Sequence, residues 1–377
     1  METLLQLTQG SFELQRLPYR PKELLRAWDA ADEYLLNTLA KEIKPSANAK
    51  ILIFNDNFGA LAVALHEFKP YAVSDSYLSQ ASTRLNLAAN QLAENEVTLL
   101  NSLQTLSGHF DYVLIKAPKT LAFLEDFLIR LQPFISNETQ IIVAGMVKGL
   151  PSSVWKLLEK LIGETTTSLA KKKARLIFAK PNPQREIPAL PYPVYYQLEN
   201  TNYTVCNHAN VFSRDSLDIG TRFLLANLPY QPQAKNIVDL GCGNGIVGLM
   251  LAEKHPQAML HFVDESFMAV DSAKQTFNQA FNHQREAQFY ITDALSKFAA
   301  DSMDLIICNP PFHQQNTVGD HIALTMFTQA RKVLKKGGQF WVIGNRHLGY
   351  HSRLKKYFSE SHTVAANKKF VIISAIK

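Results

Sequence analysis

The stretch IVDLGCGNGIVGLML, Ile237–Leu251, passes from an apolar strand through a cluster of glycines into an apolar segment with helical spacing. Gly241, Gly243 and Gly245 lack a Cβ atom, so the backbone can turn sharply there and a ligand can approach the main chain closely. A strand, a glycine turn and a helix in this order favour a nucleoside ligand, bound where the strand ends.

The rest of the chain repeats this alternation of apolar strands and segments with helical spacing. Such alternation predicts an α/β fold in which parallel sheets are covered by helices. The predicted strands are Ala49–Phe54, Tyr71–Asp75, Tyr112–Lys116 and Gln140–Gly145 in the first half, and Asn236–Leu240, Leu260–Asp264, Asp304–Cys308, Gln339–Gly344 and Phe370–Ile376 in the second.

The two halves of the chain look like copies of one plan. Setting Gly59 against Gly245 also sets Ile51 against Ile237, and FNDNFGA then stands where the second copy has LGCGNGI. Further along, KAPK, which begins at Lys116, stands where the second copy has NPPF. Because the first copy has lost its special glycines, we expect it to bind no cofactor.

The join between the copies is predicted from proline content. Residues 179–193 contain five prolines among fifteen residues, a composition that excludes both a helix and a central strand. We therefore expect a linker here, between a domain of residues 1–183 and a domain of residues 184–377. A length of 377 residues agrees with two domains.

The composition excludes several classes of protein. Hydrophobic residues make up 46% of the chain and charged residues 19%, as in ordinary globular proteins and unlike disordered or fibrous ones. We see no apolar run long enough to span a bilayer and no secretory signal. Cys206, Cys242 and Cys308 lie far apart, without the spacing of a metal site or a disulfide, which favours a cytoplasmic protein with no bound metal.

Positive charge is concentrated in parts of the chain. The net charge is +6, and Arg331–Lys377 holds eleven Lys and Arg residues against one acid. A second basic run is KKKAR, Lys171–Arg175. A surface that faces phosphates needs a local excess of this kind. An ordinary solvated surface has the same appearance, so the sequence leaves both interpretations open.

Acidic residues occur at three successive strand ends. Asp239 precedes the glycine turn, Asp264 ends the next predicted strand, and Asp293 follows in ITDAL. A carboxylate at the second position can bind both hydroxyls of a ribose, and one at the third can accept from an adenine amine. Asp239 can reach the amino-acid part of a cationic ligand through water. Gly243, Gly245 and Gly248 also match the G-x-G-x-x-G pattern of nicotinamide enzymes, but Asp239 would repel a pyrophosphate.

These motifs together resemble a known family. DLGCGNG, the acids Asp264 and Asp293, and NPPF at residues 309–312 are similar to S-adenosylmethionine-dependent methyltransferases that modify amino groups conjugated to a ring or a carbonyl. NHANVFSRDSLDIGTRFLL, Asn207–Leu225, and the degenerate first copy resemble, more closely, the bacterial ribosomal RNA guanine-N2 methyltransferases, above all those of the large subunit. This resemblance covers nearly the full length.

The resemblance implies two tandem Rossmann-like folds, each with a seven-stranded, mostly parallel sheet, of which the first serves RNA recognition. It implies S-adenosylmethionine as cofactor and 23S ribosomal RNA as partner. Two fused copies mimic a dimer within one chain, so we expect a monomer, with no obligate protein partner and no membrane. Three alternatives stay open: guanine-N2 methylation of 16S ribosomal RNA, methylation of protein glutamine N5, and a non-enzymatic ribosome-assembly protein that binds RNA. A hydride-transfer enzyme has no use for the NPPF motif.

The resemblance also assigns residues. The catalytic set is Asn309, Pro310, Pro311 and Phe312; the cofactor set is Asp239, Gly241, Cys242, Gly243, Asn244, Gly245, Asp264, Glu265, Asp293, Ala294, Asn309, Phe212 and Thr221; the RNA-binding set is Lys171, Lys172, Lys173, Arg175 and Arg346. No residue is assigned to a metal.

The NPPF motif has a physical explanation within this family. The exocyclic amine of guanine is a poor nucleophile, because its lone pair is delocalised into the ring. The side-chain oxygen of Asn309 and the backbone carbonyl of Pro310 would accept its two hydrogens and direct the lone pair at the methyl group. The prolines fix φ and carry no N–H, so the carbonyl is held in place before binding. Phe312 would stack on the extruded base.

Overall fold

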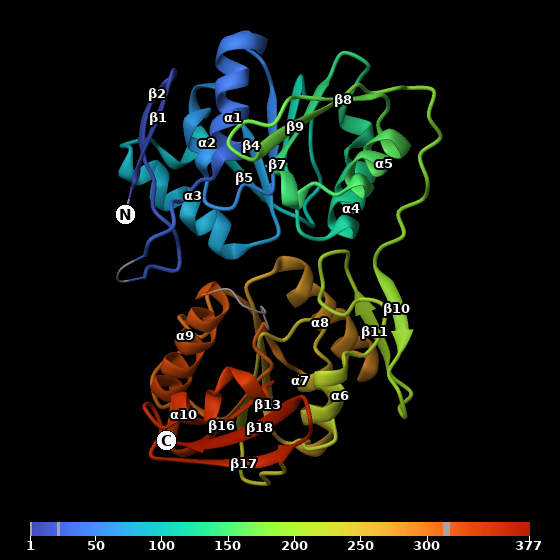
Figure 1. Cartoon of the computed structure of the whole chain (residues 1–377). Helices are drawn as coiled ribbons and strands as arrows, with labels where there is room; N and C mark the ends of the chain where they lie inside the picture. The colour runs from blue at the N-terminus through green and yellow to red at the C-terminus, as the bar shows by residue number, and fades with distance from the viewer. Residues whose placement is uncertain (1, 21–22, 312–316) are drawn as a thin grey trace. The chain divides into compact units, whose positions relative to one another are not determined.

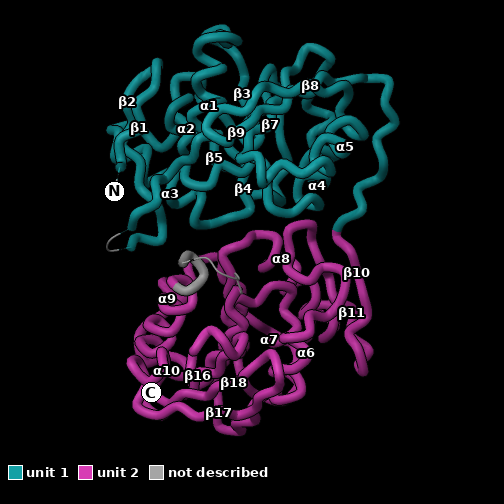
Figure 2. The backbone as a smooth tube through the Cα atoms, viewed as in Figure 1, with its two compact units in different colours: residues 1–192 teal, residues 193–377 magenta. Residues whose placement is uncertain are grey.

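The computed structural model describes residues 2–20, 23–311 and 317–377. The chain forms two compact units, Met1–Tyr192 (unit 1) and Pro193–Lys377 (unit 2), which Figure 2 shows in different colours. Residues 180–193 form neither helix nor strand, as the five prolines predict.

Unit 1 is built on a seven-stranded sheet with the order β5-β4-β3-β6-β7-β9-β8. Neighbouring strands from β5 to β7 are parallel, and β9 pairs antiparallel with both β7 and β8. The strands are β3 (Ile51–Phe54), β4 (Tyr71–Ser74), β5 (Thr98–Asn101), β6 (Tyr112–Lys116), β7 (Gln140–Met146), β8 (Thr165–Thr167) and β9 (Ala174–Ala179), and a separate hairpin joins β1 (Leu4–Leu7) to β2 (Gly10–Glu13).

Helices cover both faces of this sheet (Figure 1). The first three contribute to a core with the hairpin and one sheet face, and the other two pack together on the opposite face. Their bounds are α1 (Ala30–Thr38), α2 (Ala60–Ala64), α3 (Tyr77–Ala89), α4 (Leu121–Leu131) and α5 (Ser152–Leu161), with single turns at Leu39–Ile43, His66–Phe68, Glu94–Glu96, Gln132–Phe134 and Val147–Gly149.

Unit 2 repeats the arrangement, with the strand order β14-β13-β12-β15-β16-β18-β17. The strands are β12 (Asn236–Leu240), β13 (Met259–Asp264), β14 (Gln288–Ile291), β15 (Met303–Cys308), β16 (Leu334–Asn345), β17 (Glu360–Ala366) and β18 (Phe370–Ile376), preceded by the hairpin β10 (Val194–Gln197) and β11 (Thr204–Asn207). The helices are α6 (Ile219–Leu225), α7 (Ile246–Lys254), α8 (Phe267–Ala280), α9 (Thr317–Val333) and α10 (Tyr350–Leu354), with a single turn at Arg346–Leu348.

Two buried clusters sandwich this second sheet. One packs α6, α7 and α8 against it, and the other packs α9 and α10 against the opposite face. The predicted α/β class and the two seven-stranded, mostly parallel sheets are therefore confirmed.

The sequence analysis missed the four strands at the sheet edges and also β9, which is largely buried and lies between β7 and β8. The four edge strands β5, β8, β14 and β17 were not predicted, because they are half-exposed and several of their residues are polar. They therefore lack the continuous apolar run of a central strand. Among the described residues, no helix is long and apolar enough to cross a membrane.

Candidate active site

The candidate site lies where the strand order of unit 2 reverses. β12 and β15 are parallel neighbours, and Leu240 is paired with Cys308. The chain leaves β12 through α7 towards β13 and leaves β15 through α9 towards β16 on the other side. Open α/β sheets bind their ligands at such a switch point, outside the carboxyl ends of the strands. The glycine turn and Asn309 therefore face one site from two adjacent strands.

The glycine turn has the backbone geometry that the sequence predicts. Gly241, Gly243 and Gly245 all have positive φ, of 74°, 52° and 81°. A Cβ at Gly245 would lie 2.8 Å from the Cα of Ala273, so the close approach of α7 to α8 requires glycine there. A Cβ at Gly243 would meet nothing within 4 Å, so this glycine leaves open space beside the turn.

The acids take different positions around the turn. Asp239 is buried and accepts a hydrogen bond from the backbone N–H of Gly248 at 2.8 Å. Asp264, at the end of β13, accepts from the N–H of Gly243 at 3.1 Å and so connects the turn to the next strand. Burial raises the pKa of Asp239 to about 8, and it also raises the pKa of Asp293. Burial disfavours the charged form of this carboxyl, and a cationic ligand bound nearby would lower its pKa again.

Other predicted cofactor residues are distributed along the same strand ends. Cys242 is buried and donates its backbone N–H to Val263. Ala294 has a φ of 43°, a conformation that costs energy for a residue with a side chain and that recurs at ligand sites. Phe212 is 66% exposed, so it packs little against the described part of the protein.

Asn309 makes a specific contact with Thr221. Its Nδ2 donates to the hydroxyl of Thr221 at 3.0 Å, and that hydroxyl lies 3.4 Å from Asp218 Oδ2. Since the carboxylate can only accept, the hydroxyl donates to Asp218 and must accept from Asn309. This relay fixes the amide, and Asn309 Oδ1 is buried without a hydrogen-bond partner among the described residues.

The remainder of the NPPF motif is partly described. Pro310 is buried and Pro311 is exposed, whereas Phe312 lies outside the described residues. The carbonyl oxygen of Asn309 would lie 3.8 Å from a Cβ at Gly241, so the motif runs directly beside the glycine turn. The structure thus brings Asn309 and the turn together at one site.

A positioning group for the turn was missed. Asn207 ends β11 fully buried and accepts from the side-chain amide of Asn244 at 2.9 Å. Tyr196, from β10, lies 3.5 Å from the same amide. Asn207 opens the stretch NHANVFSRDSLDIGTRFLL, which was the signal available in the sequence, but its partner in the glycine turn depends on the fold.

Comparison with known proteins identifies the family. The model of the RLMG N-terminal domain matches residues 2–183, and the model of the methyltransferase small domain matches residues 202–374. The chain is 46% identical to ribosomal RNA large subunit methyltransferase G of Aeromonas salmonicida over 100% of both chains, and 49% identical to the Pseudomonas aeruginosa protein of that name over 98% of both. The chain belongs to the ribosomal RNA large subunit methyltransferase G family.

Membership confirms the resemblance seen in the sequence. The chain is a methyltransferase, and its cofactor is S-adenosylmethionine. The fold also matches the solved structure of a Thermus thermophilus 16S rRNA N2 G1207 methyltransferase in complex with AdoMet and guanosine, with a TM-score of 0.77 at 20% identity over 100% of this chain and 97% of that one.

Unit 1 has different groups at the matching positions. Where Leu240 pairs with Cys308 in unit 2, Phe54 pairs with Ile115 in unit 1, so Lys116 takes the place of Asn309. Lys116 is buried and its ammonium lies 2.7 Å from Asp29 and 2.8 Å from Asp32. Asp29 caps α1 as Asp218 caps α6. An ion-paired lysine thus replaces the free amide oxygen.

The turn of unit 1 is filled as well. Asn55 takes the place of Gly241 and keeps the left-handed backbone, with a φ of 65°. Its side-chain amide donates to the carbonyl of Lys116 at 3.1 Å, in the space that Gly241 leaves open beside Asn309. The first copy therefore keeps the strand–turn–helix but fills the space beside the turn.

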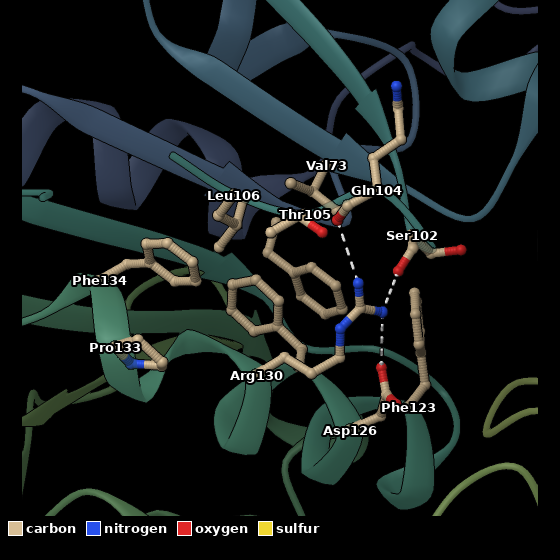
Figure 3. A pocket seen from close by; sticks show the side chains of 12 residues that line it. Val73, Ser102, Gln104, Thr105, Leu106, Phe123, Asp126, Arg130, Pro133 and Phe134 are labelled. Atoms are coloured by element: carbon tan, nitrogen blue, oxygen red, sulfur yellow. Dashed lines mark hydrogen bonds and ion pairs between the residues drawn. The ribbon is translucent and has the colours of Figure 1, made fainter. Parts of the chain in front are cut away.

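A pocket of about 260 Å³ opens elsewhere in unit 1, between α4 and the loop after β5 (Figure 3). Arg130 holds this loop through the carbonyls of Ser102 and Gln104, the latter at 3.0 Å, and pairs with Asp126 at 3.6 Å. Because its guanidinium is occupied in this way and no predicted site residue lines the pocket, we assign it no ligand.

The basic run of unit 1 makes internal contacts. Lys171 lies over the ring of Tyr34, 4.6 Å from its centroid, and Lys172 pairs with Glu33 at 2.9 Å. Lys173 is exposed and Arg175 is half-buried in β9. Both lysines are exposed to solvent, where such contacts are weak, so an RNA-binding role for the run stays a prediction.

Proposed function

We propose that this chain is a cytoplasmic, monomeric enzyme that methylates the N2 amine of one guanine in 23S ribosomal RNA. The names of its relatives support an rRNA substrate from the large subunit. The proposed division of labour follows the predicted domains: residues 184–377 carry the reaction, and residues 1–183 recognise RNA.

The observation that carries the proposal is the buried Oδ1 of Asn309, which has no hydrogen-bond partner in the described part of the chain. A buried acceptor without a partner costs stability, and a bound donor would remove that cost. An N–H of the guanine amine satisfies this acceptor. The carbonyl of Pro310, the next residue, provides the second acceptor of the proposed pair, and Pro311 fixes the chain beyond it.

The residues of unit 2 fit the methyl donor. When bound, S-adenosylmethionine supplies an electrophilic methyl group on a sulfonium ion. Gly241 and Gly243 leave space for it beside the turn, and Asp264 and Asp293 offer carboxylates for the ribose hydroxyls and the adenine amine. Glu265, Ala294, Phe212 and Thr221 belong to the same proposed lining.

Asn309 and Pro310 hold the amine during transfer. Their two acceptors draw the N–H groups out of the ring plane, which returns the lone pair to nitrogen and directs it at the methyl carbon. The new N–C bond forms as the C–S bond breaks, with its electrons passing to sulfur. The amine then loses one proton to solvent, so no strong general base is needed. Phe312 is proposed as the stacking partner of the extruded base.

The test is transfer of a labelled methyl group to unmodified RNA. The full-length protein is incubated with 23S transcripts, with 16S transcripts and with translation release factors, and digested RNA is analysed for N2-methylguanosine. We expect label in 23S RNA alone and a loss of about a hundredfold or more for Asn309→Ala, as for removal of one transition-state hydrogen-bonding group. Asn202→Ala, at an exposed residue of the β10–β11 turn, is the control.

Three outcomes would contradict the proposal. Label in 16S RNA alone or in a glutamine side chain would show that the enzyme performs the same chemistry on another substrate. No label together with no calorimetric binding of S-adenosylmethionine would favour an RNA-binding assembly protein. Full activity of Asn309→Ala would remove the assigned role of that amide.

A further inference from the structure

Two groups of cations in the C-terminal segment lie at opposite edges of the sheet. Lys335 pairs with Asp304 at 2.7 Å, and Lys377 pairs with Asp301 at 2.7 Å. Asp301 and Asp304 lie just before and within the start of β15, so these pairs are at the amino end of the parallel strands. That edge is opposite to the glycine turn, and Lys335 and Lys377 are already neutralised there.

The second group is at the other edge. Arg346 follows the end of β16, while Lys368 and Lys369 form the turn between β17 and β18. The register pairs Asn345 with Phe370, so the three cations meet at one point. All three are exposed, and none has a carboxylate partner among the described residues. We call Arg346, Lys368 and Lys369 the cationic edge.

The cationic edge is close to the proposed acceptor. β15 and β16 are parallel neighbours, and Cys308 is paired with Val342. Asn309 follows Cys308, and Arg346 comes four residues after Val342, roughly 10 Å further along the strand than Asn309. Side chains provide a second connection. A Cβ at Gly220 would lie 3.2 Å from the ring of Phe370, and Thr221, the residue after Gly220, binds Asn309.

The turn that carries these cations is held in one conformation. Asn367 Oδ1 accepts from the backbone N–H groups of Lys369 and Phe370, at 2.8 and 2.7 Å. The N–H of Arg346 donates to the carbonyl of Lys369 at 3.0 Å, and its guanidinium donates to the carbonyl of Asn367 at 3.3 Å. One guanidinium N–H group is thus used to brace the turn, and the charge stays at the surface.

We propose that the cationic edge binds the sugar-phosphate backbone of the RNA next to the target guanosine. This inference rests on the proposed function and names the surface that unit 2 itself offers to the substrate. Phosphate contacts fix the register of a nucleic acid without reading its sequence. Here they would position the strand so that one base reaches Asn309, whatever unit 1 recognises elsewhere on the RNA.

The experiment compares two edges of the same sheet. Lys368→Gln/Lys369→Gln and Arg346→Gln are compared with Lys336→Gln, which removes one charge from an exposed site in the first part of β16, near the amino edge. RNA binding by the full-length protein is measured with an unmodified 23S transcript over a series of salt concentrations. Donor affinity is measured by calorimetry, and KM for RNA and kcat are measured separately.

We expect the double variant to bind RNA about tenfold more weakly at moderate salt. The slope of log affinity against log salt should fall by about 1.4, since each phosphate contact in a single strand contributes about 0.7. KM for RNA should rise while donor affinity stays at the wild-type value, and Lys336→Gln should change neither. Arg346→Gln should lower the slope by about 0.7.

Two results would overturn the inference. If the cationic-edge variants match Lys336→Gln in salt slope and KM, the RNA backbone does not bind there, and the proposed function would still stand on the activity of the wild type. If wild-type protein methylates a protein substrate and the variants lose affinity for that acidic partner, both the inference and the proposed function fail.

Discussion

The Nδ2 atom of Asn309 donates to the hydroxyl of Thr221, 3.0 Å away, and this hydroxyl in turn faces Asp218. The three groups form a relay with one direction, because the carboxylate can only accept. Asn309 Oδ1, which has no hydrogen-bond partner among the residues that the structure describes, is therefore held in place before any substrate arrives. Preorganisation of this kind avoids reorientation during the reaction.

Thr221→Val should reduce kcat about tenfold, because the amide of Asn309 loses the partner that sets its orientation. Thr221→Ser retains the hydroxyl and is the matched control, with kcat expected within about twofold of wild type. Single-turnover methylation at saturating donor separates this effect from donor binding. Equal losses in both variants would show that the methyl group of Thr221 matters and that the relay does not.

Gly241→Asn should weaken donor binding without unfolding unit 2. Unit 1 already has Asn55 at the matching position, with a left-handed backbone and its amide against the neighbouring carbonyl. Asparagine tolerates this backbone conformation better than most residues. We expect at least a tenfold loss of donor affinity by calorimetry, and a melting temperature without donor that stays within a few degrees of wild type.

The control for this substitution is Gly108→Asn. Gly108 also has a positive φ, of 78°, and a Cβ there meets nothing within 4 Å. It should leave donor affinity unchanged. Wild-type donor affinity in Gly241→Asn would mean that the space beside Gly241 is not used by the ligand.

Asp239 should make the stability of unit 2 depend on pH. Its pKa is about 8 in the folded protein, against an ordinary value of 3.8. Unfolding therefore releases a proton between pH 4 and 8, and the free energy of unfolding falls as pH rises through that window, by about 1.4 kcal/mol per pH unit. Below about pH 4 the contribution of Asp239 to stability is fully present, and above about pH 8 it is lost.

Asp239→Asn removes this slope and should also weaken donor binding. Urea unfolding can be followed by Trp341 fluorescence after Trp28 and Trp155 are replaced by Phe. The free energy of unfolding of the variant, relative to that of the wild type, should increase from pH 6 to pH 8. A difference that is constant with pH would mean that Asp239 is ionised in the free protein.

Lys116→Met should destabilise unit 1 by about 3 to 5 kcal/mol, because it leaves the buried Asp32 without its counter-ion and the half-exposed Asp29 without its partner. Burial raises the pKa of Asp32 to about 7 even with Lys116 present. As for Asp239, the free energy of unfolding falls as pH rises from about 4 to 7. Without Lys116 the carboxyls can avoid charge only by protonation, so the loss should be larger at pH 8 than at pH 6.

Calorimetric unfolding at the two pH values measures this effect. Lys119→Met is the matched control, since Lys119 is exposed a few residues away and its replacement should change stability by less than about 0.5 kcal/mol. A loss that is the same at pH 6 and pH 8 would assign the effect of Lys116→Met to packing alone.

Some parts of the protein could be predicted and others could not. The central strands follow from runs such as Asn236–Leu240, which are apolar on both faces because helices cover both. β14 was missed because its residues are half-exposed and give no such run. The sequence predicts KKKAR as a basic surface. It could not predict the contact of Lys172 with Glu33, because these residues are 139 positions apart in the chain.

The sequence by itself determined the α/β class, the duplicated plan, the glycine turn and the family, since these depend on local periodicity and on residue types at short spacing. Only the tertiary structure decided that Thr221, 88 positions away, binds Asn309, and that Lys116 in the other copy meets two aspartates at the same place. The physical reason is that the hydrogen-bond partner of a side chain at a strand end depends on which other element lies beside that strand end. The position of that element is fixed only when the helices pack on the sheet.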